Sequence, residues 1–160
     1  MSEMIPRRTV IHGDDLFSFE VAQEWSHEVE DNGTQVFWDP QSGSGTLRVS
    51  AITATTPPMV GASPAAEALN TKATIHIRDD GIAWTHYRVE RENNGDPTIS
   101  FWWKLARFQA PQSINLALFS FTIYAREERH APTARQIALL GETLPSTSFV
   151  GSRGPSANVA

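Results

Sequence analysis

Three long segments in the second half of the chain predict consecutive β-strands. They are Ile82–Glu92, Ile99–Ala110 and Ile114–Arg126. Each is rich in aromatic and β-branched residues, and turn-forming sequences containing Gly, Pro, Asn or Asp separate them. Because strands joined by short turns pair antiparallel, these segments predict a meander in an antiparallel sheet.

The first half of the chain predicts three more strands and a short helix. Alternating apolar and polar residues indicate strands over Leu16–Ala22, Thr34–Asp39 and Gly45–Thr53. A loop rich in Pro follows, and Ser63 before Pro64 is typical of a helix start. We expect that helix to run over Pro64–Lys72.

A second helix is predicted near the end of the chain, over Ala134–Thr143. Thr133 and Gln136 have the spacing of a capping box, and Pro145 ends the apolar stripe. With the six strands, the two main helices predict an α+β fold built on a central antiparallel sheet.

The adjacent residues Trp102 and Trp103 must lie on opposite faces of their strand. A five-residue loop over Asn93–Pro97 would set Tyr87 opposite Trp103, and a three-residue loop after Ala110 would set Phe121 opposite it. Large cross-strand pairs of this kind stabilise sheets. Trp103 is therefore predicted to be in the core. The second face then carries Trp102, Arg88, His86 and Lys104.

Composition limits the class of protein. The chain has 160 residues, with 13 Lys and Arg against 18 Asp and Glu, so its net charge of −5 argues against nucleic-acid binding. Cysteine is absent, which excludes disulfides and thiol catalysis. We expect one domain over residues 1–150 and a disordered tail over 151–160. No apolar leader or long apolar run is present, so we expect a soluble, cytoplasmic protein without membrane insertion.

The order of these elements resembles the PsbP-like superfamily. The resemblance rests on "FSFEVAQEW", "GTLRVS", the helix, the three long strands and the closing helix before "STSF". It implies a three-layer α/β/α sandwich with a central antiparallel sheet of about six strands and two main helices. The superfamily includes photosystem extrinsic subunits and a nuclear transport factor that binds a small GTPase, so the resemblance implies protein binding and no catalytic residues to transfer.

The sequence contains no strong motif for a catalytic or metal-binding site. His76 and His86 are the only plausible pair of histidine ligands, and a third ligand is missing, so we predict no metal and no cofactor. A hydrolase would have to combine Ser50 or Ser120 with His86 and Glu90. A small-molecule enzyme on the polar sheet face, with Glu20, Arg48 and His86, remains the alternative function.

The function favoured by the sequence is non-catalytic binding of a protein partner. Trp102, flanked by Arg88, Lys104 and His86, combines residue types that are common at interfaces. The structural alternative is that the second helix or the loop Thr55–Ser63 covers Trp102. A role in bacterial secretion or immunity, in which acidic residues such as Asp79/Asp80 or Asp14/Asp15 meet a basic partner, and a homodimer are further alternatives.

Overall fold

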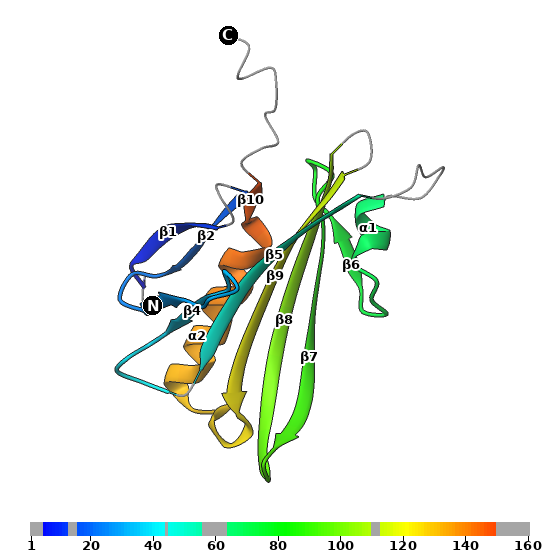
Figure 1. Ribbon diagram of the computed structural model, residues 1–160. Coiled ribbons are helices and arrows are strands. Elements are labelled where there is room, and N and C mark those ends of the chain that lie inside the picture. The colour runs from blue at the N-terminus through cyan, green and yellow to red at the C-terminus, as the bar shows by residue number, and fades with distance from the viewer. Residues whose placement is uncertain (1–4, 13–15, 44, 56–63, 110–112, 150–160) are drawn as a thin grey trace.

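The computed structural model describes residues 5–12, 16–43, 45–55, 64–109 and 113–149. Antiparallel strands dominate it (Figure 1). The strands are β1 Arg7–His12, β2 Phe17–Ala22, β3 Ser26–Val29, β4 Gln35–Trp38, β5 Thr46–Thr55, β6 Ile75–Ile77, β7 Ala83–Asn93, β8 Asp96–Gln109, β9 Ser113–Tyr124 and β10 Ser148–Phe149. The helices are α1 Pro64–Ala68, α2 Ala131–Thr143 and the 3-10 turns η1 Ala125–Glu127 and η2 Leu144–Ser146.

The strands form a sheet of seven in the order β3-β4-β5-β9-β8-β7-β6 and a sheet of three in the order β1-β2-β10. The small sheet and α2 lie on one side of the large sheet, and α1 lies on the other (Figure 1). The predicted α+β fold with a dominant antiparallel sheet is confirmed. The predicted numbers of strands and helices differ from the observed ones. The large sheet has seven strands where about six were expected, and α1 has only five residues, so there is one main helix where two were expected. The predicted tail, 151–160, lies outside the described residues.

We call the side of the large sheet that packs on α2 and the small sheet the helix face. Trp103 points to this face and is 1% exposed, so its predicted place in the core is confirmed. Phe119 lies directly opposite it on β9. Aromatic residues of β2 and leucines of α2 complete the same apolar cluster; its largest fully buried side chains include Trp103, Phe17, Phe37, Phe119, Phe121, Leu140 and Leu144.

The β8–β9 hairpin keeps the predicted faces with a shifted register. Gln109 pairs with Ser113, so Trp103 faces Phe119 where Phe121 was expected. The shift is two residues along β9. Because side chains alternate with a period of two, every side chain stays on its predicted face.

The β7–β8 hairpin departs from the predicted register by one residue. Its turn has two residues, Asn94 and Gly95, with φ of 56° and 85°, and Asn93 pairs with Asp96. Two positive φ values are typical of a type I′ turn, which Asn-Gly favours. A change of one residue moves all of β7 to the other face relative to β8. Tyr87 therefore lies opposite Trp102, and the predicted pairing with Trp103 is wrong.

Helix α2 begins earlier than predicted. Its N-cap is His130, so Thr133 lies inside the first turn and makes no capping box with Gln136. Gln136 instead donates from Nε2 to Asp39 Oδ2 and to the Ser42 carbonyl, each at 3.2 Å. These bonds tie α2 to the connection between β4 and β5. Within the described residues, no helix has the length and apolarity needed to cross a bilayer.

A chain of polar contacts joins the two sheets. Gln35 on β4 bonds through Oε1 to Nδ1 of the buried His12 on β1, and its Nε2 lies 3.3 Å from His27 Nε2 on β3. The second contact requires that His27 Nε2 be unprotonated and accept the hydrogen bond. Burial, and next the positive charge of Arg8, lower the pKa of His27.

The two tryptophans should differ sharply in their contribution to stability. We expect Trp103→Ala to lower the free energy of unfolding by about 3–5 kcal/mol, because it leaves a large cavity in the core. Trp102→Ala should cost clearly less, since its side chain is only half-buried. Urea denaturation at 25 °C measures both. Equal, large losses would mean that both faces are fully buried.

The lowered pKa of His27 predicts acid sensitivity. The unfolded chain takes up a proton near the ordinary value of 6.5, while the folded chain takes it up only at lower pH. The free energy of unfolding should therefore fall as the pH drops below about 6.5. His27→Gln should reduce this fall, and His130→Gln is the matched control. Identical pH profiles for wild type and His27→Gln would contradict the assignment.

Candidate functional site: the open half of the sheet

Helix α1 covers only one end of the face opposite α2. Ala65 and Leu69 pack against Ala83 on β7 and Ala106 on β8. Trp102 lies four residues from Ala106, which is about 13 Å along a strand. Helix α1 lies at one end of the large sheet (Figure 1), and the half-buried Trp102 is not among the residues it packs against. The predicted cover by the second helix is wrong, because α2 packs in the cluster of Trp103 on the opposite face. Of the other predicted cover, the loop over 55–63, residues 56–63 lie outside the described residues. We call the uncovered part of this face, centred on Tyr87, Trp102 and Lys104, the open half.

Two aromatic rings and one ammonium group form the centre of the open half. The rings of Tyr87 and Trp102 stack with their centroids 6.4 Å apart. Lys104 Nζ lies 5.2 Å from the Tyr87 centroid and 5.6 Å from that of Trp102. Both distances allow cation–π attraction. Among the described residues no carboxylate pairs with Lys104, so its charge is available to a ligand.

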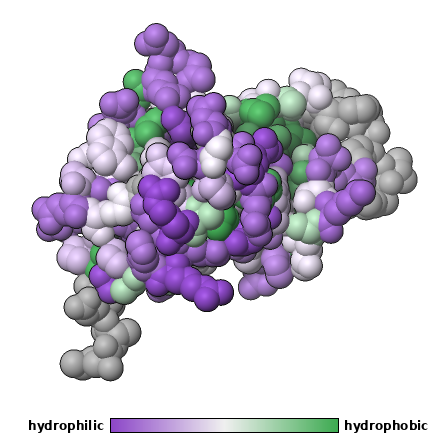
Figure 2. Space-filling view, turned by 90° about the horizontal axis from the view of Figure 1, so that it is seen from below, coloured by the Kyte–Doolittle hydropathy of each residue, from purple (hydrophilic) through white to green (hydrophobic). Residues whose placement is uncertain are grey.

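The neighbours of this cluster mix apolar and polar side chains. Ile52 on β5 and Phe108 on β8 are 46% and 36% exposed, and Tyr124 on β9 is 37% exposed. Ser120 lies opposite both Trp102 and Arg48. From below, the molecular surface is mainly hydrophilic, with hydrophobic residues in a few small areas (Figure 2).

Positive charge exceeds negative charge near the centre of the open half. Arg91 on β7 shares this face with Tyr87, and no ion pair involves its side chain within the described ranges. Arg48 pairs with Glu30 at 3.6 Å. Arg126 lies over the Tyr124 ring at 4.4 Å. The face is therefore locally cationic in a chain whose net charge is −5.

Two residues predicted to share the site with Trp102 lie on the helix face. Arg88 lies opposite Phe101 and His86 lies opposite Trp103, because of the one-residue change in register. Arg88 Nη1 lies 2.5 Å from Glu90 Oε2, and Arg88 Nη2 lies 2.9 Å from Glu128 Oε1.

Arg88 and His86 already have hydrogen-bond and stacking partners within the chain. Hydrogen bonds from Arg88 to Glu128, and next to Glu90, raise the pKa of the guanidinium. His86 stacks on Trp103 at 4.6 Å, and its Nδ1 bonds to the Trp102 carbonyl at 2.9 Å. The structure thus brings Trp102 and Lys104 together and separates Arg88 and His86 from them.

The candidate enzyme sites are not assembled. Ser50 and Ser120 face the open half, whereas His86 and Glu90 face the other side of the sheet. Glu20 belongs to the small sheet, where it lies 3.8 Å from Arg7. A hydrolytic arrangement of these groups on the polar sheet face is therefore wrong.

His76 and His86, the predicted histidine pair, each stack on a tryptophan ring. His76 lies 4.3 Å from the ring of Trp84, its cross-strand partner, and shares the helix face with His86. Over the described ranges, no group of three His, Cys, Asp or Glu side chains could hold a metal ion.

Sequence reasoning missed Tyr87 as a member of the site. The signal that could have found it is the Asn94–Gly95 pair, which favours a two-residue hairpin turn. With that turn in place, Tyr87 falls opposite Trp102.

No protein-family model matches the sequence, and no curated protein matches it. Solved structures show the fold. LpqN of Mycobacterium tuberculosis, involved in cell envelope biogenesis, matches with a TM-score of 0.54 at 14% identity over 92% of each chain. A protein from Bacteroides thetaiotaomicron matches with a TM-score of 0.52 at 17% identity, over 73% of this chain and 41% of its own. The chain thus spans less than half of that protein.

A PsbP protein is also among the matches. CyanoP of Synechocystis sp. PCC 6803 aligns over 92% of this chain and 94% of its own, with a TM-score of 0.43 at 10% identity. At these identities the likenesses concern the course of the chain alone.

The geometry of the open half predicts an energetic coupling. In a double-mutant cycle, Lys104→Met and Trp102→Leu should couple by about 0.5–1 kcal/mol, because each removes the same cation–π contact. Arg88→Met and Trp102→Leu should be additive within about 0.5 kcal/mol, since these side chains lie on opposite faces. Urea unfolding of the six proteins measures both cycles. Coupling only in the Arg88 cycle would instead support the register predicted from the sequence, in which Arg88 shares a face with Trp102.

Proposed function

We propose that this protein is a non-catalytic binding protein that docks an acidic segment of a protein partner on its open half. One observation carries the proposal. The half-buried rings of Trp102 and Tyr87, which the described part of α1 does not cover, lie beneath Lys104, whose ammonium group has no carboxylate partner in the described parts of the chain.

The aromatic residues supply contact area. Tyr87 and Trp102 are half-buried and stacked, so little side-chain freedom remains to be lost on binding. Tryptophan and tyrosine are enriched among residues that dominate binding energy. The PsbP-like resemblance implies a three-layer sandwich, and in this chain α1, with five residues, is the short element on the third side. We infer that a bound partner extends this layer over Trp102.

The charges define the chemistry of the partner. Lys104 and Arg91 lie on the open half without ion-pair partners among the described side chains. Complementary charge steers association and penalises wrong partners. An acidic segment with apolar side chains therefore fits this face, whereas a basic partner is repelled from it.

A second copy of the chain fits less well. A two-fold interface brings the same patch of both subunits together, so the unpaired cations on Lys104 and Arg91 would meet their own copies. This like-charge contact disfavours the homodimer considered from the sequence.

The biological setting stays a prediction. A role in secretion or immunity and a cytoplasmic location rest on composition, and LpqN, which shares the fold, is involved in cell envelope biogenesis. Fold similarity is a weak guide to function. The enzyme alternative loses its proposed residues, because Ser120 and His86 lie on opposite faces of the sheet.

Capture from the native cell followed by quantitative affinity measurement tests the proposal. Once a partner has been identified by mass spectrometry, Trp102→Ala and Lys104→Glu should each weaken its affinity at least about tenfold, the loss typical of a desolvated interface anchor. Affinity should also fall when salt is raised from 50 to about 300 mM.

Variants on the helix face are the matched controls. Arg88→Ala and His86→Ala should leave the affinity within about twofold, provided that circular dichroism shows a folded chain. Unchanged affinity for both Trp102→Ala and Lys104→Glu would exclude the open half as the docking surface. Loss of affinity confined to Asp79→Asn or Asp80→Asn would move the site to the turn between β6 and β7.

A further inference from the structure

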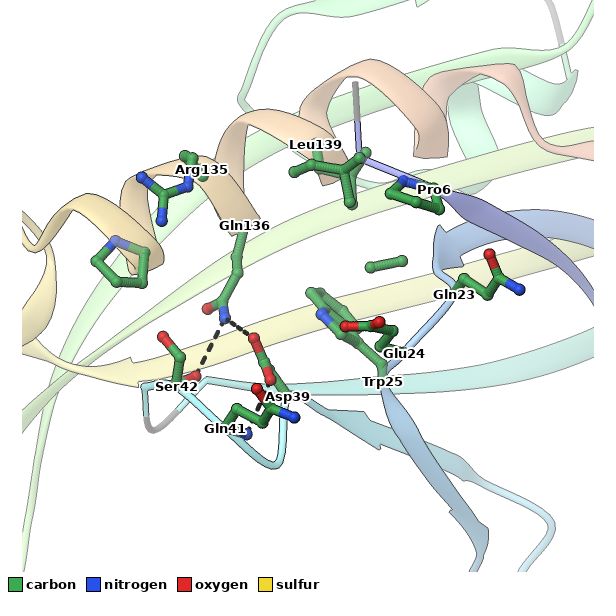
Figure 3. A pocket seen from close by; sticks show the side chains of 13 residues that line it. Pro6, Gln23, Glu24, Trp25, Asp39, Gln41, Ser42, Arg135, Gln136 and Leu139 are labelled. Carbon is green, nitrogen blue, oxygen red and sulfur yellow. Dashed lines mark hydrogen bonds between the residues drawn. The ribbon is translucent and has the colours of Figure 1, made fainter. Parts of the chain in front are cut away.

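A pocket of about 330 Å³ lies between the first half of α2 and the connections that follow β2 and β4. Its volume falls at the lower end of the range of about 300–1,000 Å³ for small-molecule sites. Figure 3 shows side chains from these separate segments around one space. The pocket is on the side of α2, away from the open half, so a ligand here is independent of the docking proposed above.

The polar end of the pocket has more acceptors than donors. Gln136 uses Nε2 for Asp39 Oδ2 and the Ser42 carbonyl, and the backbone N–H of Gln41 donates to Asp39 Oδ1 at 2.9 Å (Figure 3). Asp39 has no cationic partner among the described side chains.

Two neighbouring acceptor atoms are left over. Gln136 Oε1 and Thr133 Oγ1 are buried and have no hydrogen-bond partner, and their residues are 7% and 1% exposed. Both lie beside Gly43, where a Cβ would be 3.5 Å from each. Buried polar atoms normally have partners. Gln136, which lines the pocket, therefore has a buried carbonyl oxygen without a donor, and the Thr133 hydroxyl beside it has no partner either.

The rest of the pocket is apolar and firmly held. Trp25 and Leu139 line it and are 5% and 4% exposed. The Trp25 ring stacks on Phe121 at 6.0 Å with an angle of 11°, and its carbonyl accepts a bond from Arg8 Nη2 at 2.9 Å. An indole wall beside a carboxylate suits an organic cation, because the ring face attracts positive charge.

We propose that this pocket binds a small organic cation with N–H donors, an ammonium or guanidinium group on an apolar body. The cationic head donates to Asp39, and the body packs against Trp25 and Leu139. Glu24 on the rim adds a second negative charge. Arg135 also lines the pocket but is exposed, and within the described residues no ion pair joins it to Asp39.

Four benzene derivatives in two pairs of similar shape, benzylamine with benzyl alcohol and benzamidine with benzoate, test the charge requirement on the full chain. Benzylamine and benzamidine are the cations, benzyl alcohol is neutral and benzoate is the anion. The readout is the indole N–H signal of Trp25 in ¹H–¹⁵N spectra, assigned with Trp25→Phe. We expect saturable shifts with both cations, affinity at least about tenfold lower for benzyl alcohol, and no shift with benzoate.

Asp39→Asn should weaken benzylamine binding at least about tenfold, because it removes the charge and nearly preserves the shape. Asp96→Asn, at the exposed β7–β8 turn, is the matched control and should bind as wild type does. If Asp39→Asn fails to fold, Glu24→Gln takes its place with a severalfold loss. Benzoate binding as tight as benzylamine, unchanged affinity in the folded carboxylate variant, or no Trp25 shift at about 10 mM cation overturns the proposal.

Discussion

The two-residue turn at Asn94–Gly95 determines which side chains share a face across the β7–β8 hairpin of the sheet. Its positive φ values of 56° and 85° suit asparagine and glycine and strain most other residues. A strand slipped by one residue presents its other set of side chains. This turn therefore sets Tyr87 beside Trp102 and sends Arg88 to Glu128 on the helix face. The composition of the open half depends on the conformation of these two residues.

Unequal covering of the two faces follows from element length. Strand β8 has 14 residues and is about 46 Å long at 3.3 Å per residue. Helix α1 has five residues, about 8 Å at 1.5 Å per residue, so it shields only the end around Ala83 and Ala106. The other face packs against the 13 residues of α2 and against β2. A long sheet with one main helix thus leaves aromatic residues such as Trp102 only half-buried.

The sequence was informative where one face of a strand is clearly apolar. Phe101, Trp103 and Leu105 alternate with more polar residues on β8, so its core face could be predicted. Strand β7 gave no such contrast, because Trp84 lies on one face and Tyr87 and Val89 on the other. The short strands β1, β3, β6 and β10 were missed, since runs of two to six partly polar residues show little alternation. The pocket could not be predicted either, since Gln136 and Asp39 are 97 positions apart.

The two candidate sites have complementary chemistry on opposite sides of one sheet. The open half offers the unpaired cations Lys104 and Arg91, and the pocket offers the acceptors Asp39 and Gln136. They are connected through packed rings, because Trp25 in the pocket wall stacks on Phe121, which lies opposite Phe101 beside Trp102 in β8. Because dense cores transmit small displacements, a shift of Trp25 and Phe121 acts on the β8 backbone at Phe101, next to which Trp102 points to the other face. Because the two sites lie on opposite sides of the sheet, their ligands do not compete for space.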